Sequence, residues 1–580
     1  MNRMNPELRS HKWFLHNNIE VRALHQSALR SAGFDMDAYT GQPVIGIANT
    51  WSELNSCNMS LNVIAAHVKD GIREAGGIPV EFPTFSLGED LMKPTAMLYR
   101  NLLSMVVEEN LRTYPLDGVI LLGNCDKTVP GLAMGAISAN LPFIQLNAGP
   151  KKVGTFKGQR MGSGTDLWKY SDELKLGKIS LDDWDAIVKS LSCGFGACNT
   201  MGSASTMNGV LEALGVMPLG LSTMPVACEE RYALSKEAGR RIVSMVIEKL
   251  TPQTILTKAA FENAIKVCMA LGGSTNAVLH LTAMAGRLNI SVYPKSFEEA
   301  GQKIPCIANV QPGGEFLIDD LDAAGGIPAV MQEIKEHLHL SSITYTGSPL
   351  EKLLSHKKPV NRTVIKSCSN PVKAAPSLCV LHGSLAPDGA IIKTSAASPE
   401  LFVHTGPAIV FDDYKEMLAV VEDPSREFDP NAVLILRNVG PVGLPGMPEW
   451  GMIPIPISLQ KKGIRDMVRI SDARMSGTSF GTVILHVAPE ASVGGPLCIV
   501  RNNDLISLDI PNRKLDICIS QEEIQQRRAL LKPVPSKYTR GYLKLFQTNV
   551  LQANEGCDFE MLKPKTQKDL EFIEPIIGRS

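Results

Sequence analysis

The segment GVILLGNCDKTVPG, residues 118–131, joins a short apolar run to a polar, glycine-rich loop. A short, continuous apolar run bounded by turn residues is typical of a buried strand, so residues 118–122 are predicted to be one. Two further runs of this kind are PVIGIA, residues 43–48, and LPFIQL, residues 141–146. The loop 123–131 should lie at the carboxyl end of the sheet, where ligands gather in open α/β sheets.

Helical patterns lie between and after these strands. Apolar residues recur at helical spacing over 61–74, 95–112, 205–214, 233–249, 259–286 and 320–337. Strands that alternate with helices predict a mostly parallel sheet with helices on both faces. We therefore predict an N-terminal α/β domain over residues 1–370.

The pattern changes after about residue 360, where short β-rich runs punctuated by Gly and Pro dominate. These runs occupy residues 408–411, 432–436, 467–470, 483–487 and 497–500, and residues 505–510 and 514–519 flank a hairpin turn. We predict a β-barrel-like domain over residues 371–580, with few helices. Ser520 and Glu523 form a capping box that should open a helix toward Leu531. The tail beyond Pro533 is expected to be irregular and is a candidate for an arm on a partner subunit.

Composition excludes several functional classes. The chain has 580 residues, 44% of them hydrophobic and 20% charged, which suits a soluble protein of at least two domains. Its net charge of -1 does not favour nucleic-acid binding, which needs a concentrated basic surface. The polar N-terminus and the absence of a long apolar stretch favour a cytoplasmic protein that neither enters nor crosses a membrane. Twelve cysteines in such a protein are not expected to form a disulfide framework.

Cysteines occur in three polar loops. Cys57 ends the loop after the first strand, Cys125 lies in the loop after the second, and residues 192–205 contain Cys193 and Cys198. The chain has no CxxC pair here, and spacings of roughly 70 residues fit no local metal motif. From composition and spacing alone, these residues are either a metal or cluster site or buried thiols without a chemical role.

Longer motifs carry a resemblance to a known family. GNCDKTVPG and CGFGACNTMGSAST are similar to two signatures of the dihydroxy-acid and sugar-acid dehydratases, and SDARMSGTSFGTVILHVAPEA, residues 471–491, resembles a third. Further stretches that match in order are residues 272–281, 321–331, 385–396 and 438–451. This resemblance, which runs from about residue 9 to beyond residue 510, implies an enzyme that removes water from a 2,3-dihydroxy acid to leave a 2-keto acid.

The resemblance assigns cofactors to named residues. Cys57, Cys125 and Cys198 fall where relatives ligate an iron–sulfur cluster through three thiolates, whereas Cys193 does not. The cluster is expected to be [2Fe–2S], with [4Fe–4S] as the alternative. Further resemblance-based assignments concern Mg²⁺: its expected ligands are Glu89, Asp126 and Glu449, together with Lys127, which is carbamylated in relatives.

The resemblance also assigns the proton transfer. Ser476 occupies the place of a serine alkoxide that acts as base, and Thr478 is expected to help bind substrate. The 3-hydroxyl is a poor leaving group and the C2 proton is weakly acidic, so both steps need metal assistance. Serine is an effective base only when its alkoxide is stabilised. His486 follows an apolar run and is expected to be a core or domain-contact residue.

The substrate has several candidates. RSHKWF at residues 9–14, GMPEWG and CNTMGSAST look more like the sugar-acid branch of the family, so the expected substrate is an aldonate, in particular a pentonate such as arabinonate or xylonate. The alternatives are a branched-chain dihydroxy acid and, more remotely, phosphogluconate. A non-catalytic iron–sulfur sensor would need the cysteines but not Glu89, Lys127 or Ser476.

The resemblance further implies an arrangement of domains and subunits. An N-terminal α/β domain and a C-terminal swivelling β-barrel domain should enclose the site between them, with Glu449 and Ser476 contributed by the second. Relatives are homodimers or dimers of dimers, so a homo-oligomer is expected.

Overall fold

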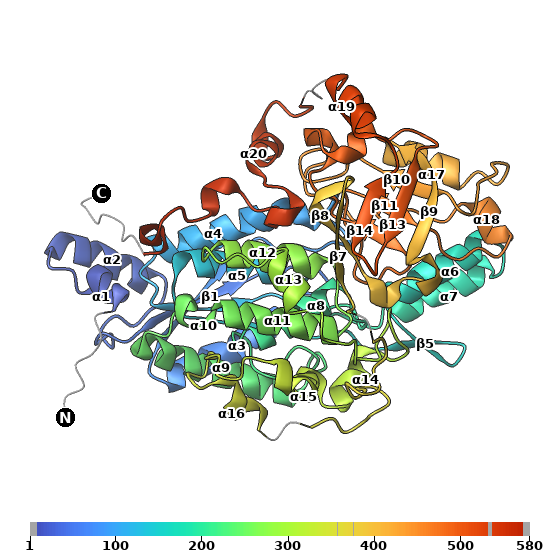
Figure 1. The fold of residues 1–580 in the computed structure, drawn as a ribbon. Coiled ribbons are helices and arrows are strands. Elements are labelled where there is room, and N and C mark those ends of the chain that lie inside the picture. Colours follow the sequence, from blue (N-terminus) through green and yellow to red (C-terminus); the bar gives the residue numbers. More distant parts are fainter. Residues whose placement is uncertain (1–7, 356–357, 375, 532–535, 572–580) are drawn as a thin grey trace.

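The computed structural model describes residues 8–355, 358–374, 376–531 and 536–571. Its N-terminal part contains a parallel sheet with the strand order β2-β1-β3-β4, and β1 of this sheet is labelled in Figure 1. The strands are β1 (Val44–Asn49), β2 (Ile78–Pro83), β3 (Gly118–Leu122) and β4 (Phe143–Leu146). The three predicted strands and their parallel pairing are confirmed. The edge strand β2 was not predicted, because its sequence IPVEFP carries two prolines and a charge, which edge strands tolerate.

Helices cover both faces of this sheet. The helices of the N-terminal part are α1 (Arg9–Phe14), α2 (Ile19–Ser31), α3 (Leu61–Glu74), α4 (Arg100–Thr113), α5 (Thr128–Ala139), α6 (Thr165–Lys175), α7 (Leu181–Leu191), α8 (Ser203–Ala213), α9 (Glu229–Glu248), α10 (Pro252–Ile255), α11 (Lys258–Ala270), α12 (Asn276–Gly286), α13 (Lys295–Glu299), α14 (Ile318–Ala323), α15 (Gly326–Glu333) and α16 (Leu350–Leu354). In Figure 1, α3 and α9 lie on one side of the strands, and α4 and α5 lie on the other. A short antiparallel hairpin, β5 (Gly154–Phe156) and β6 (Gln159–Met161), precedes α6.

Two predicted long helices are interrupted. The helix expected over 259–286 is α11 and α12, separated by residues 271–275, which include Gly272 and Gly273. The helix expected over 320–337 is broken between α14 and α15. Glycine is a poor helix former, and here it overrides the apolar periodicity around it. The first break places Asn276 at the start of α12, beside the second domain.

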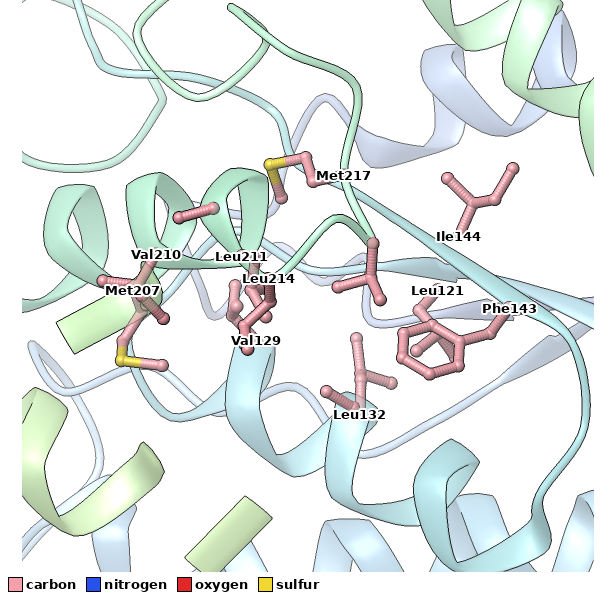
Figure 2. Packing of buried hydrophobic residues seen from close by; sticks show 14 of the residues in the cluster. Leu121, Val129, Leu132, Phe143, Ile144, Met207, Val210, Leu211, Leu214 and Met217 are labelled. Atoms are coloured by element: carbon pink, nitrogen blue, oxygen red, sulfur yellow. The ribbon is translucent and has the colours of Figure 1, made fainter. Parts of the chain in front are cut away.

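The core beneath the sheet's carboxyl end fixes the loops that matter for function. Figure 2 shows side chains of α5, among them Val129 and Leu132, packed with Leu121 and Phe143 of the neighbouring strands. Side chains of α8, including Leu211, pack into the same cluster. All of these side chains are buried. The loops that precede α5 and α8 are therefore anchored at the well-packed first residues of these helices.

The C-terminal part contains a closed barrel, as predicted, with the strand order β10-β11-β12-β8-β7-β14-β13-β9 (Figure 1). Its strands are β7 (Cys379–Gly383), β8 (Ala386–Ile392), β9 (Val403–Phe411), β10 (Val433–Leu436), β11 (Arg469–Ser471), β12 (Val483–Leu485), β13 (Leu505–Asp509) and β14 (Lys514–Ile517). Two short helices, α17 (Tyr414–Val421) and α18 (Ile457–Lys461), lie between its strands in sequence. The predicted hairpin corresponds to β13 and β14.

The strand predicted at 497–500 is wrong. Residues Pro496–Ile499 form a 3₁₀ helix, because Pro496 opens a helical turn and the backbone bonds run locally, as from Cys498 N–H to Gly495 C=O. Conversely, β7 and β8 were not predicted. Pro387 and Gly389 precede the apolar residues of β8, and this pattern of Pro and Gly is typical of a loop.

The C-terminal tail also differs from its prediction. The helix α19 (Gln521–Ala529) begins after Ser520, whose hydroxyl accepts the Glu523 N–H as predicted, but the Glu523 carboxylate pairs with Arg527 instead of completing the capping box. Beyond it, α20 (Gly541–Asn549) is helical rather than irregular.

The tail packs against the N-terminal domain of its own chain. Phe546 and Phe559 are buried in a cluster with Met97 and Leu279 of the N-terminal domain. Arg100 donates hydrogen bonds to the carbonyl oxygens of residues 556 and 557, and the buried Arg287 and Asp558 side chains form an ion pair. No helix in the described part of the chain combines the length and apolar character needed to cross a membrane.

Candidate active site

Asparagine side chains tie the three cysteine loops together. The Asn58 side-chain oxygen accepts the Asn124 backbone N–H at 3.1 Å, and the Asn124 side chain donates to the Cys57 carbonyl at 2.9 Å. The loop before α8 joins them through Gly196, whose N–H donates to the Ser56 carbonyl at 3.0 Å. Loops that follow β1 and β3 therefore meet the 192–205 loop at one edge of the sheet.

The three cysteines predicted as ligands sit in this junction. The side chains of Cys57 and Cys125 are buried. The Cys57 side chain, burial and Asp126 together raise the pKa of Cys125 well above its usual range, and burial raises the pKa of Cys198 to about 12. As free groups Cys125 and Cys198 are therefore protonated thiols, and their thiolates would need a cation beside them.

Cys193 has different surroundings from these three. Its sulfur donates to the Ser190 carbonyl at 3.1 Å and lies against Gly154 of the β5–β6 hairpin. All twelve cysteines are free.

Three carboxylates converge on Lys127. The ammonium nitrogen lies 3.0 Å from Glu89 and 3.0 Å from Glu449, and it also contacts the adjacent Asp126. The lysine side chain is fully buried. Burial by itself lowers the pKa of Lys127, but the carboxylates of Asp126, Glu449 and Glu89 outweigh it and raise the pKa well above its usual range.

Further polar residues, which were not predicted, hold Glu449. Arg474 donates to the Glu449 carboxylate at 2.9 Å and Asn276 donates to the same oxygen at 2.9 Å. Burial opposes the ionised form, but Lys127 and Arg474 lower the pKa of Glu449 to about 2. The guanidinium of Arg474 also binds the Thr95 hydroxyl and the Met447 carbonyl. Asn276 and Arg474 lie inside motifs that were identified, but a sequence does not reveal which partner a buried polar residue will meet.

Ser476 and Thr478 form a second pair from the barrel domain. Their hydroxyl oxygens are 3.0 Å apart, and the Thr478 backbone N–H lies 3.4 Å from the Ser476 hydroxyl. Between them, Gly477 packs directly on the start of α8: a Cβ there would lie 2.4 Å from the Ser203 backbone nitrogen. Only glycine permits this approach, which brings the loop to the positive end of the helix dipole.

Asn276 connects the serine loop to the carboxylates. Its side-chain amide donates to the Met475 carbonyl at 3.3 Å as well as to Glu449. On the other side, the Cys125 sulfur lies 3.5 Å from an Asp126 carboxylate oxygen. The predicted cysteines, carboxylates and hydroxyls thus form three adjoining groups at the junction of the two domains.

Comparison with known families decides the affiliation. The family described as dihydroxy-acid/6-phosphogluconate dehydratase matches with its N-terminal part at residues 42–353 and with its C-terminal part at residues 363–557. The chain belongs to this dehydratase family. The resemblance found in the sequence is therefore confirmed, and the protein is an enzyme of the hydro-lyase class.

Individual relatives match this dehydratase over nearly its whole length. A putative dehydratase of Rhizobium meliloti is 48% identical over 97% of this chain and 98% of its own. A 6-deoxy-6-sulfo-D-gluconate dehydratase of Pseudomonas putida is 45% identical over 96% of both chains. An L-arabinonate dehydratase of Rhizobium leguminosarum is 44% identical over 96% of both. Four dihydroxy-acid dehydratases are 36–38% identical over 93% of this chain.

The donor sets of the dehydratase can be compared with the expected cofactors. Soft thiolates suit iron–sulfur clusters, and carboxylate oxygens suit Mg²⁺. Among the described residues, no three or more His, Cys, Asp or Glu side chains are grouped closely enough to hold a single metal ion. The Lys127 ammonium group lies among the carboxylates, at the position where a metal cation would be expected. The carboxylates of Glu89, Asp126 and Glu449 are donors of the type that Mg²⁺ prefers, but here they surround an ammonium group, whose positive charge carbamylation would remove.

Proposed function

We propose that this dehydratase converts a sugar acid, specifically an aldonate and first of all a pentonate, to its 2-keto-3-deoxy acid. The observation that carries the proposal is the contact of Glu449, from the second domain, with Lys127 of the first, while Asn276 joins Glu449 to the carbonyl of Met475, the residue before Ser476. This link supports a site in which the Ser476 hydroxyl would act near the carboxylates of Glu89, Asp126 and Glu449. The sugar-acid dehydratases among the relatives support the substrate class, since they are 43–45% identical to this chain.

We further propose the cofactors. Cys57, Cys125 and Cys198 would hold an iron–sulfur cluster, [2Fe–2S] in preference to [4Fe–4S]. Magnesium would lie among the carboxylates that now surround Lys127, with the lysine carbamylated: Glu89, Asp126 and Glu449. When bound, these groups supply Lewis acidity toward the departing 3-hydroxyl and toward the substrate carboxylate.

The chain itself would move the C2 proton. The Ser476 oxygen, in its ionised form, accepts the proton from C2 and becomes a neutral hydroxyl. Loss of that proton and of the 3-hydroxyl leaves an enol, which tautomerises to the 2-keto acid. Thr478 favours the ionised form, because its hydroxyl and its backbone N–H both lie within hydrogen-bonding reach of the Ser476 oxygen. The positive end of α8, packed on Gly477, acts in the same direction.

The neighbourhood of this pair is polar, which suits a polyhydroxylated substrate. The Thr165 hydroxyl at the start of α6 donates to the Thr478 carbonyl, and Ser163 and Asn199 are hydrogen-bonded to each other nearby. A site built to hydrogen-bond substrate hydroxyls rejects analogues that lack them strongly. The branched-chain dihydroxy acid remains the alternative substrate. The sensor alternative finds no support, since the named relatives are dehydratases.

A substrate panel tests the proposal. Anaerobically purified enzyme with Mg²⁺ would be assayed for 2-keto acid formation from four- to six-carbon aldonates and from 2,3-dihydroxyisovalerate. We expect kcat/KM for the best aldonate to exceed that for dihydroxyisovalerate by about 100-fold or more. Preference for dihydroxyisovalerate would move the enzyme to branched-chain amino-acid biosynthesis, and preference for a six-carbon acid would correct the chain length.

Location and assembly complete the proposal. We propose a cytoplasmic enzyme, because free cysteines and an iron–sulfur cluster suit a reducing compartment. We also propose a homodimer or a dimer of dimers. Large apolar side chains exposed around the Cys57 loop support it, since exposed apolar groups mark association surfaces: Trp51, Leu54 and Leu91. Light scattering of the purified enzyme measures the assembly directly.

A further inference from the structure

Lys393 is a buried lysine immediately behind the serine loop. It follows β8, and its side chain is fully buried. Its ammonium nitrogen lies 3.4 Å from the carbonyl oxygen of Gly477, the residue between Ser476 and Thr478. Among the residues that the structure describes, no carboxylate forms an ion pair with Lys393. This sets it apart from Lys127, which has three.

The surroundings of Lys393 contain few groups that could stabilise its charge. The titratable groups that face it are two buried thiols, Cys268 from α11 and Cys306 from the segment after α13. Burial lowers the pKa of Lys393 to about 8, against a partial opposing effect of the two thiols. Burial raises the pKa of Cys268 to about 12 and that of Cys306 to about 11, so both remain neutral.

The segment that carries Lys393 also supports the far end of the serine loop. The Gly481 N–H donates to the Ala396 carbonyl at 2.7 Å. The loop 476–481 is thus held by α8 on one side and by residues 393–396 on the other. A charged group in this position acts on the loop both through its hydrogen bond and through its field.

Burial of a lysine without an ion-pair partner in the core is unfavourable for the stability of the fold. Taking an ammonium group out of water is unfavourable without a partner, and an apolar side chain of the same length would pack there without that cost. Perturbed, buried titratable groups beside a reacting centre are candidates for a functional role. The position of Lys393 relative to Gly477 indicates which role.

We propose that Lys393 is a positioning residue for proton transfer at Ser476: its ammonium group anchors the Gly477 carbonyl and favours the ionised form of the Ser476 hydroxyl. A positive charge in a poorly solvated site stabilises a nearby anion far more than it would in water. The inference rests on the proposed function, because it takes Ser476 as the base. Lys393 itself contacts neither substrate nor cofactor in this scheme.

The proposal predicts that kcat decreases at alkaline pH. The active form carries protonated Lys393, so kcat should fall as pH rises through about 8, where the ammonium group loses its proton. Arginine keeps its charge throughout this range. A lysine that only fills space would give no such limit.

The test compares Lys393→Met and Lys393→Arg with the parent holoenzyme. Lys393→Met should keep the visible cluster spectrum, a thermal midpoint at or above the parent's and a KM within about 3-fold, while kcat falls by about 10- to 100-fold, at the lower end of general-base contributions. It should also lack the alkaline decline of kcat. Lys393→Arg should keep more activity than Lys393→Met, and its decline should move to higher pH.

Two controls separate this proposal from the function on which it rests. Lys266→Met removes another buried lysine, which lies on α11 and contacts His339, and this variant should behave like the parent. Ser476→Ala assayed in parallel reports on the base itself: if it retains turnover, the proposed function fails. If Ser476→Ala is inactive while Lys393→Met has the parent's kcat and pH profile, only the role of Lys393 is overturned. If Lys393→Met does not fold, the pH profiles of the parent and of Lys393→Arg still test the role of Lys393. That role is overturned if the parent's kcat does not decline near pH 8. It is also overturned if the decline in Lys393→Arg is the same as in the parent.

Discussion

The side-chain nitrogen of Lys127 lies 3.0 Å from the carboxylate of Glu449, 322 residues further along the chain. Lys127 follows β3 of the parallel sheet, and Glu449 belongs to the loop between β10 and α18 of the barrel domain. The contact therefore exists only when the two domains are docked. It also places one positive charge where the proposed Mg²⁺ must lie, so the charge of Lys127 becomes the first quantity to test.

We predict that Lys127 is carbamylated in the active enzyme, which replaces its positive charge with a carbamate anion. An ammonium group and a divalent cation cannot share the same three carboxylates without strong repulsion, whereas a carbamate adds oxygen ligands. Enzyme depleted of bicarbonate should lose activity and regain it on addition of bicarbonate. With ¹³C-bicarbonate, the parent should show a carbamate signal by NMR, and Lys127→Arg should not. A fully active enzyme without that signal would contradict the prediction.

The carboxylates around Lys127 should set the Mg²⁺ requirement. Glu89→Gln, Asp126→Asn and Glu449→Gln each remove a charge from the proposed site. Each should raise the Mg²⁺ concentration for half-maximal activity by more than the roughly 10- to 100-fold that loss of an outer-shell partner costs. The cluster spectrum should persist. Glu237→Gln, which alters an exposed ion pair, serves as the control, and a variant with the parent's Mg²⁺ dependence would exclude its residue from the site.

Cysteine replacement tests the cluster ligands. Cys57→Ser, Cys125→Ser and Cys198→Ser should each bleach the visible absorption and abolish turnover, because serine is a harder donor that suits iron–sulfur clusters poorly. The matched control is Cys193→Ser, five positions before Cys198, which should keep both colour and activity. Retained absorption and turnover in Cys198→Ser would refute the assignment of that residue.

The sequence predicted the fold where local pattern and tertiary environment agree. Continuous apolar runs identified β1, β3 and β4, since these strands are buried on both faces. It failed at β2, an edge strand with prolines, and at the short helix starting at Pro496, whose apolar run resembles a strand. It also failed for the tail around α20, because nothing in the local sequence shows that Phe546 packs against the N-terminal domain.

The sequence predicted those residues of the site that lie at recognised positions of family motifs. The cysteines, the Asp126-Lys127 pair and Ser476 were found through motifs rather than through any periodicity. Asn276, Arg474 and Lys393 were not, although each lies in a motif that was recognised. Their roles depend on long-range hydrogen bonds, such as that from Asn276 to Glu449. Such contacts follow from domain docking, which a linear pattern does not encode.

Docking of the tail should contribute measurably to stability. The Arg287 guanidinium makes two hydrogen bonds to the Asp558 carboxylate, and both side chains are fully buried. Asp558→Asn leaves a buried cation without its counter-charge, which should cost about 3 kcal/mol and lower the urea midpoint. The control Glu427→Gln breaks an exposed pair with Lys462 and should change stability by no more than about 0.5 kcal/mol. Equal midpoints for the two variants would show that the tail is not held by this pair.

Among the residues that the structure describes, no histidine near the serine loop offers an obvious substitute base. His486 is buried, as expected, and burial together with Arg474 lowers its pKa to about 3, so it holds a proton poorly near neutral pH. Ser476 is therefore the group on which proton removal from C2 should depend.

Exchange of the substrate's C2 proton with deuterated water, measured alongside turnover in Ser476→Ala, tests the central claim most directly. The substitution removes one hydroxyl and adds no bulk, so the cluster spectrum and substrate binding should match the parent's, and Ser425→Ala at an exposed position is the control. We predict that exchange and dehydration both fall by about 10²- to 10⁴-fold, the usual contribution of a general base. A Ser476→Ala enzyme that exchanges and dehydrates at the parent's rate would contradict the account.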